Sequence, residues 1–301
     1  MTNGRPRRKK DPLYLEDITL TIPAPGMEEN ENLFLSNLFL GRYNEDQIME
    51  MLEIVGITPI LRRKGYHNLI VSILRQDNYT SRLFVNFDTV VKETRLIELI
   101  VREGLFRPKQ QFLDGYDFSK GLSMMLIEWL ALQDPRAVFS EDKPRLPGQE
   151  YPGLGGLKNI YDLLYRFVRS MGKDAIVDIP EYYHAAVIYS KMYADIYSRK
   201  YSFFSPVDAG KVQSMIRDLN DRPLADISFA IAFGCLVNRN TGEKTQWKPS
   251  EQIYPISNTL QRYFEDDLYK AIVNKTMEES RFSIDWERYD TLHSQGMLDA
   301  L

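Results

Sequence analysis

Cysteine and histidine are scarce in this sequence. Cys235 is the only cysteine among 301 residues, so an intramolecular disulfide is excluded. The three histidines, His67, His184 and His293, lie far apart, and none has the spacing of metal ligands. We therefore predict no metal site. A single thiol fits a reducing compartment, and the expected location is the cytoplasm.

Long apolar runs are also missing. No stretch approaches the roughly 20 apolar residues that a membrane-spanning helix needs, so no membrane partner is expected. The basic start, "MTNGRPRRKKDP", is not followed by the apolar segment of a secretory signal. These two observations predict a protein that is neither inserted into a membrane nor secreted.

No strong excess of one charge is present. Lysine and arginine number 38 and aspartate and glutamate 42, a formal net charge of -4. This mildly acidic balance argues against a broad nucleic-acid-binding face. Residues 1–30, rich in Pro, Gly, Asn and charge, are expected to form a flexible tail. Its basic cluster, Gly4–Lys10, is interpreted as solvated, the alternative being an arm that neutralises phosphates.

Helix and strand patterns alternate in the middle of the chain. "NEDQIMEMLEIVG", Asn44–Gly56, carries a capping residue and apolar residues at helical spacing. Two apolar runs around "QDNYTS" predict a β-hairpin, whereas "LIELIVREGLF" fits a strand or a short helix. "GLSMMLIEWLALQDP", Gly121–Pro135, is interpreted as a central strand, with a buried helix as the alternative.

A glycine-rich loop, "LPGQEYPGLGG", then leads into a clear helix. The apolar stripe of that helix runs from Leu157 to Met171, and Gly172 ends it. "AIVDIP", Ala175–Pro180, predicts a short buried strand. Glu181–Ser198 predicts a second helix with Ala185, Ile188, Tyr189, Met192 and Ile196 facing inward. The order strand, loop, helix, strand, helix predicts two parallel strands with a right-handed crossover.

The C-terminal third shows weaker patterns. "DAGKVQSMIRDLN" predicts a helix, and "ISFAIAFGCLVNRNTGEKTQW" predicts two strands around the turn "NRNTGE". We therefore divide the chain into a tail (1–30), an α/β domain (31–205), and a C-terminal helix and β-hairpin extension packed on it (206–301). The expected fold class is α+β, or mixed α/β.

The segment from Met124 to Tyr197 resembles the core of the GNAT acyltransferases. In that family a central strand leads to a Q/R-x-x-G-x-G/A loop that holds the pyrophosphate of acyl-coenzyme A. The resemblance implies a mixed sheet with helices on both faces, and acetyl-CoA or another acyl-CoA as substrate. It also implies that the coenzyme is bound by residues of the glycine-rich loop, namely Gln149, Gly153, Leu154, Gly155 and Gly156.

The chemistry of the loop agrees with that role. Glycines let a phosphate approach the unpaired N–H groups at a helix start. The alternative is a tight strand-to-helix connector without a ligand. The stretch Leu146–Gly155 is also similar to the LPGQ-x-x-PGLG stretch of a group of bacterial proteins.

The resemblance also suggests catalytic residues. Tyr189 occupies the position from which many family members protonate the leaving thiolate, and a phenol with a pKa near 10 is protonated at neutral pH. Packing among neighbouring tyrosines is its alternative role. Glu128 is the candidate base, because it is the only charge inside "MMLIEWLALQ" and burial would raise its pKa. A solvated or arginine-paired Glu128 is the alternative. His184 could replace Glu128, although an exposed or capping position near the helix start is the simpler interpretation.

Two functions follow from these residues. The first is an acyl-coenzyme A-dependent N-acyltransferase acting on an unknown amine acceptor. The second is a degenerate acyltransferase fold that serves as a non-catalytic binding or scaffolding module, with a protein partner. Pro152, which lacks an N–H, and the Tyr193–Ala194 pair in place of the family's Gly-Phe favour the second. The glycines at the helix start and Tyr189 favour the first.

Overall fold

A large mixed β-sheet organises the protein. The computed structural model describes residues 20–21, 37–75, 77–191 and 201–296. Within these ranges the strands lie in the order β2 (Leu69–Arg75), β3 (Thr80–Phe87), β4 (Arg95–Phe106), β5 (Leu122–Leu132), β6 (Ala175–Asp178), β10 (Gln252–Pro255) and β7 (Ser202–Phe203). A short β1 (Leu20–Thr21) pairs with β4. The mixed α+β class expected from the sequence is confirmed.

The parallel pair at the centre of the sheet is β5 and β6. Met124 lies beside Ala175, and the pairing continues in parallel to Ile127 beside Asp178. The other strand pairs of this sheet are antiparallel in the part of the chain that the structure describes. The prediction that these two segments are neighbouring parallel strands is confirmed, as is the β2–β3 hairpin. The ambiguous segment before β5 is the strand β4.

Helices cover both faces of the central strands. The connecting helix α4 (Leu157–Ser170) packs with Met125 and Ile127 of β5 in one core cluster. Met124 and Leu126 alternate with them and lie in a second cluster with residues of α6 (Pro206–Asp218) and α8 (Asn258–Glu265). This alternation follows from the period of two residues in a strand.

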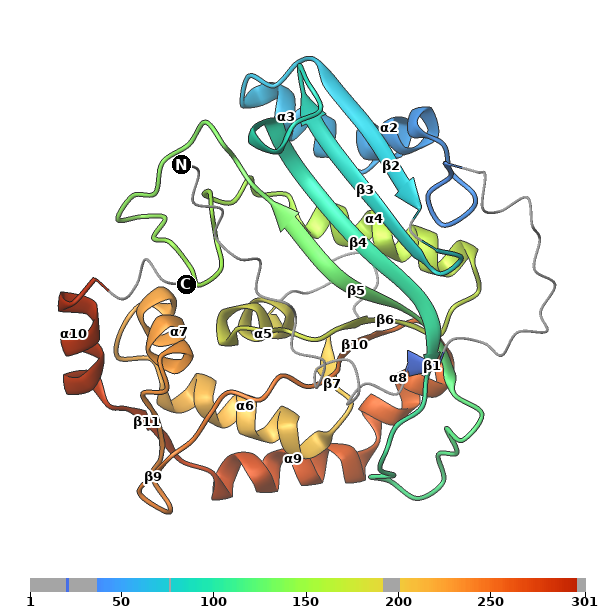
Figure 1. Ribbon diagram of the computed structural model, residues 1–301. Coiled ribbons are helices and arrows are strands. Elements are labelled where there is room, and N and C mark those ends of the chain that lie inside the picture. Colours follow the sequence, from blue (N-terminus) through green and yellow to red (C-terminus); the bar gives the residue numbers. More distant parts are fainter. Residues whose placement is uncertain (1–19, 22–36, 76, 192–200, 297–301) are drawn as a thin grey trace.

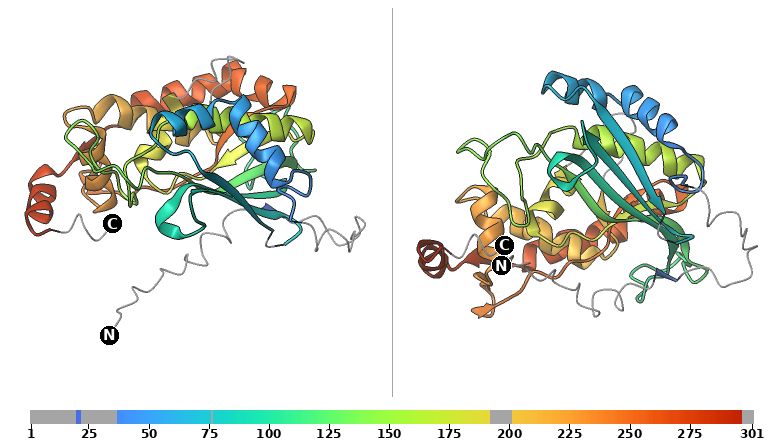
Figure 2. Two further views of the ribbon diagram at one scale, coloured as in Figure 1. Left: turned by 90° about the horizontal axis from the view of Figure 1, so that it is seen from above. Right: turned by 45° about the horizontal axis from the view of Figure 1, so that its top comes forward.

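The first cluster also includes the N-terminal helices α2 (Glu45–Ile54) and α3 (Ile57–Arg63). Asn44 caps α2 as expected. Its side chain accepts a hydrogen bond from the Gln47 backbone amide, and the Gln47 side chain accepts one from the Asn44 backbone amide. Figure 1 shows α2, α3 and α4 behind the β2–β5 part of the sheet, and Figure 2 shows the same grouping from above.

The C-terminal third adds helices and a small second sheet. Its further helices are α7 (Leu224–Ala232), α9 (Asp267–Glu279) and α10 (Trp286–Ser294). Earlier in the chain, α5 (Tyr183–Lys191) follows β6, and the 3-10 turn η2 (Lys92–Thr94) precedes β4. The second sheet has the order β11 (Phe282–Ile284), β8 (Leu236–Asn238) and β9 (Glu243–Lys244). Although β10 lies in the segment assigned to the C-terminal extension, it is inserted between β6 and β7 of the main sheet.

Two sequence-based assignments in this region are wrong. The two strands predicted around "NRNTGE" are present as β8 and β9, but the first is shorter than predicted. The run "ISFAIAF" before it lies in and directly after α7, which is buried on most sides and therefore lacks the one-sided apolar stripe of a surface helix. In α5 the most buried side chains are those of Tyr183, His184, Ala186 and Val187, rather than the predicted inward set. The reason is that α5 also packs against α7. Met192, Ile196 and the tail apart from β1 fall outside the described residues.

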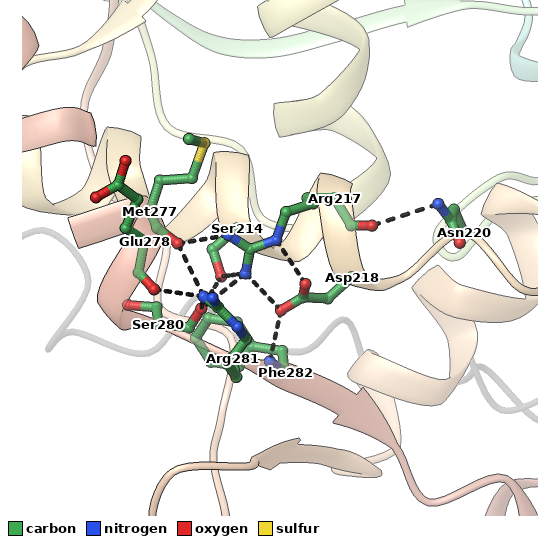
Figure 3. Close-up of polar contacts among 9 residues, drawn as sticks. All are labelled: Ser214, Arg217, Asp218, Asn220, Met277, Glu278, Ser280, Arg281 and Phe282. Carbon is green, nitrogen blue, oxygen red and sulfur yellow. Dashed lines mark hydrogen bonds and ion pairs between the residues drawn. The ribbon is translucent and has the colours of Figure 1, made fainter. Parts of the chain in front are cut away.

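Arginine side chains join α6 to the end of α9. The Arg217 guanidinium donates to Asp218 and to the carbonyl oxygens of Met277 and Ser280 at 2.7 and 2.8 Å. Arg281 donates to carbonyls of the same turn, including that of Glu278 (Figure 3). These bonds satisfy carbonyl groups that the last turn of a helix leaves without partners. The cluster therefore holds β11 and α9 against α6.

Candidate functional site at the carboxyl ends of β5 and β6

The parallel strands part at a bulge. Ile100 of β4 lies beside Trp129 and Val101 beside Ile127, so that Glu128 is an extra residue on β5. The pairing of β5 with β6 also ends at Ile127. In α/β sheets, ligand sites lie at the carboxyl ends of parallel strands where neighbouring connections diverge. The residues around this point are therefore the strongest candidates for a site.

Glu128, the predicted base, is ion-paired. Arg102 Nε donates to Glu128 Oε1 at 2.6 Å, and Arg102 also lies 3.9 Å from Asp77. This is the arginine-paired arrangement that the sequence left as the alternative. The Glu128 carboxylate is therefore already engaged by a side chain of the protein.

The glycine-rich loop lies along the far end of β5. The Gln133 amide donates to the carbonyl oxygen of Leu96 on β4. The Leu132 carbonyl belongs to the same peptide group and points the opposite way, toward the other edge of β5. The Leu154 amide donates to that carbonyl at 3.2 Å. The loop thus occupies the edge of β5 along which β6 does not continue.

The loop ends directly on the start of α4. Gly155 and Gly156 both have φ of 79°, a left-handed conformation that favours glycine, and Gly156 is the N-cap residue. A Cβ on Gly156 would lie 3.0 Å from Ile57 Cδ1, whereas one on Gly155 would meet no described atom within 4 Å. The helix start is therefore packed on one side by α3, and the backbone at Gly155 can be approached.

Two other predicted binding residues shape the loop itself. Gln149 Oε1 accepts the Leu146 amide at 3.1 Å, so this side chain closes a turn. Gly153 lies opposite Gln133 in an isolated bridge, beside the Leu154 bond already described. Gly148 packs against the Tyr182 ring, which a Cβ would approach to 2.9 Å. The loop is thereby held to β5 and to the segment just before α5.

Tyr189, the predicted acid, belongs to a group of tyrosines. Its ring is stacked on Tyr201 at 5.7 Å and meets the edge of Tyr161 at 5.6 Å. Burial raises the pKa of Tyr189 above its usual value, and the charge of Asp178 adds to the rise. The phenol is consequently protonated at neutral pH, as a proton donor must be.

Asp178 is the residue that the sequence analysis missed. Its side chain is 3% exposed at the carboxyl end of β6, and its Oδ1 accepts the Tyr161 hydroxyl at 3.0 Å. Burial raises the pKa of Asp178 to about 7, although the hydroxyls of Tyr201 and Tyr161 oppose the rise. Asp178 Oδ2 and the Tyr201 hydroxyl are both buried, and neither forms a hydrogen bond with the described residues, although the hydroxyl is near enough to act on the pKa of Asp178. The available signal was a lone carboxylate inside the apolar strand "AIVDIP".

Gln252 lies next to Asp178 on β10. The two residues are cross-strand neighbours, which places their side chains on the same face of the sheet. Gln252 Nε2 donates to the Ala186 carbonyl at 3.2 Å and to Ser190 Oγ at 2.9 Å, both on α5. Its Oε1 is buried and, within the described ranges, has no donor. Two unsatisfied acceptors therefore lie together beside the tyrosines.

His184 does not belong to this group. It is 9% exposed, and its Nδ1 lies 2.9 Å from Ser228 Oγ on α7. Burial lowers the pKa of His184 to about 4, so the ring is neutral at pH 7. The expectation of an exposed or capping histidine is wrong, because α7 covers the start of α5. The pair has a structural role in joining these helices.

Comparisons with known proteins assign no family to this geometry. The sequence matches no protein-family model and no curated protein. Across the described part of the chain, no helix is both long and apolar enough to cross a bilayer. The same part contains no group of three or more His, Cys, Asp or Glu side chains placed to hold a metal ion.

Proposed function

We propose that the protein is an acyl-coenzyme A-dependent N-acyltransferase whose acceptor is an amine. The observation that carries the proposal is the position of the glycine-rich loop. The loop lies along the carboxyl end of β5, beyond the point at which β6 stops pairing with that strand, and it runs into the start of α4. A helix start with exposed glycine backbone is suited to a diphosphate, which coenzyme A carries. The GNAT-like order of strand, loop, helix, strand and helix supports the same proposal.

The loop residues divide into two roles under this proposal. Gln149 and Leu154 hold the loop in shape through their own hydrogen bonds. Gly155, Gly156 and the first turn of α4 then supply the backbone that faces the diphosphate. The edge of β5 between Glu128 and Leu130, where pairing with β6 has ended, would receive the amide-bearing arm of the coenzyme.

Acyl transfer needs a proton donor for the leaving thiolate. Tyr189 is protonated, partly buried and close to the strand ends, so it fits the role of general acid. The attacking amine must also lose a proton. Glu128 is held by Arg102, so its carboxylate is occupied and not free to receive that proton.

The engaged Glu128 also favours a second candidate, a non-catalytic binding module. Such a protein would use the same loop and helix start for a ligand without turning it over. The two candidates differ in one measurable respect. The module would bind coenzyme A but leave acetyl-CoA intact in the presence of primary amines, whereas the enzyme would release free thiol.

Calorimetry and thermal unfolding with coenzyme A test the proposal. At a ligand concentration about 100 times the dissociation constant, binding should stabilise the fold by about 2.7 kcal/mol. Gly155→Val should abolish this gain, because a branched side chain blocks the approach of phosphate to the backbone. Tyr189→Phe should keep coenzyme binding and slow thiol release.

A matched control separates ligand loss from backbone strain. Gly242, in the β8–β9 turn, has a φ of 74° and open space around its would-be Cβ, much as Gly155 has. Gly242→Val should therefore impose similar strain while leaving coenzyme binding unchanged. Wild-type protein that shows neither heat nor a thermal shift at millimolar coenzyme A would refute the diphosphate role and leave the loop as a structural connector.

A further inference from the structure

We propose that Asp178 and Gln252 bind the primary ammonium group of the acyl acceptor, and that Asp178 takes its proton. The identity of this amine as the acceptor rests on the proposed function. The binding site itself rests on side-chain geometry alone. The substrates that such a site would accept are small primary alkylamines, whose ammonium group has three N–H donors and a positive charge.

Two buried oxygen atoms lack a hydrogen-bond donor among the described residues. Asp178 Oδ2 and Gln252 Oε1 are both buried, and neither accepts a hydrogen bond from any part of the chain that the structure describes. Buried polar atoms without partners are rare and costly, so a pair on adjacent strands calls for a ligand that donates. One carboxylate and one amide oxygen together suit a donor that is also a cation.

The surroundings are also those of a cation site. The rings of Tyr161, Tyr189 and Tyr201 pack against one another, and all three lie near enough to Asp178 to bond to it or feel its charge. Faces of aromatic rings attract a desolvated ammonium group. Tyr161 from α4, Tyr189 from α5, Tyr201 before β7, and Gln252 on β10 are the polar groups that face Asp178 from the elements packed against it.

The proton balance fits the placement of Tyr189 in the same cluster. The ammonium group gives one proton to Asp178, and the freed nitrogen lone pair attacks the thioester carbonyl carbon. As the C–S bond breaks, the thiolate takes the Tyr189 proton, and the phenol is reprotonated by the second proton lost from nitrogen. Asp178 then releases its proton to solvent. An acid with a pKa near neutrality can both accept and release a proton here.

Binding can be tested without coenzyme A. Butylamine at pH 8.5 should raise the melting temperature of the full-length protein. Butanol, which is uncharged and has a single O–H donor, and tetramethylammonium, which is charged but has no donor, should not. The shift should grow between pH 6 and 8.5 as Asp178 ionises, while the amine remains protonated, since alkylammonium groups titrate near pH 10. Calorimetry should give an affinity at least about tenfold weaker for Asp178→Asn, because one partner of a buried charge pair is lost.

Two control variants separate the loss of the Asp178 carboxylate from a general effect of mutation. Asp162→Asn, which removes a carboxylate of α4 that is ion-paired with Arg166, should bind butylamine as the wild type does. Asp178→Glu keeps the carboxylate, so it should bind butylamine more tightly than Asp178→Asn does. Equal shifts for butylamine and butanol, or an unchanged affinity in Asp178→Asn, would overturn the inference.

A parallel coenzyme A titration distinguishes the two proposals. Coenzyme binding without amine binding refutes the ammonium site and leaves the proposed function standing. Amine binding without coenzyme binding upholds the site and refutes the acyl-coenzyme A function.

Discussion

Asp178 combines deep burial with an incomplete set of hydrogen bonds. Its carboxyl group has one hydroxyl donor, Tyr161, and its pKa is raised to about 7 by burial. The ordinary aspartate pKa is 3.8. Between these values the unfolded chain has lost the proton while the folded protein retains it. The folded state therefore loses stability as pH rises through this interval.

Replacing Asp178 with asparagine should remove this dependence. Between about pH 4 and pH 7 the wild-type free energy of unfolding should fall relative to that of Asp178→Asn by up to about 1.4 kcal/mol per pH unit. Urea titrations of both proteins across this range measure the difference. The comparison cancels groups common to both proteins, such as Asp134, whose pKa is lowered by Tyr66 and Lys64 despite its burial. Parallel curves for the two proteins would show that Asp178 titrates normally.

Helices α6 and α9 pack closely at a glycine. Gly210 of α6 faces Thr276 and Val273 of α9 so closely that a Cβ would lie 2.6 Å from both Thr276 Cβ and the Val273 carbonyl oxygen. Real Cβ atoms do not approach backbone atoms to this distance. The absence of a side chain at Gly210 is thus what allows the two helices to pack.

Gly210→Ala should be destabilising, against the usual trend. In an open helix this change gains about 1 kcal/mol from helix propensity. Here the overlap forces the helices apart, and overpacking of this kind costs about 1 to 3 kcal/mol. Thermal unfolding should show a lower melting temperature for Gly210→Ala, whereas Lys211→Ala, on the exposed neighbouring position, should change little. An unchanged or higher melting temperature for Gly210→Ala would show that α9 can move aside.

The C-terminal third is part of the main sheet rather than an independent unit. β10 pairs with β6 through Gln252–Pro255 and with β7 through Gln252 and Ile253. Leu260 and Tyr263 of α8 lie in the same core cluster as Met124 of β5. Contacts between distant parts of the sequence therefore connect the two halves of the chain.

We expect the protein to unfold in one cooperative transition. Tyrosine fluorescence and far-ultraviolet circular dichroism should give coincident urea curves, because both halves share one core. A chain ending at Glu251 should fail to show a cooperative transition, since it lacks β10 and α8 and leaves β6 and β7 without their common neighbour. Two separate transitions in the full chain would instead indicate an independently stable N-terminal part.

Local patterns in the sequence determined much of the framework. The amphipathic stripe of α4, the cap at Asn44, the hairpin of β2 and β3, and the parallel pair β5 and β6 were all predictable. Each depends on residues close together in the chain or on the short connection of a βαβ unit, for which periodicity, capping and handedness are informative. The glycine-rich loop was recognised for the same reason.

Only the tertiary structure decided what surrounds the candidate site. α7 was mistaken for a strand because burial on most sides removes helical periodicity. Glu128 is paired because the register of β4 brings Arg102 beside the bulge. Asp178 and Gln252 are neighbours because β10 returns from far along the chain to lie beside β6. Such pairings depend on how distant strands align, and no local property of either segment specifies that alignment.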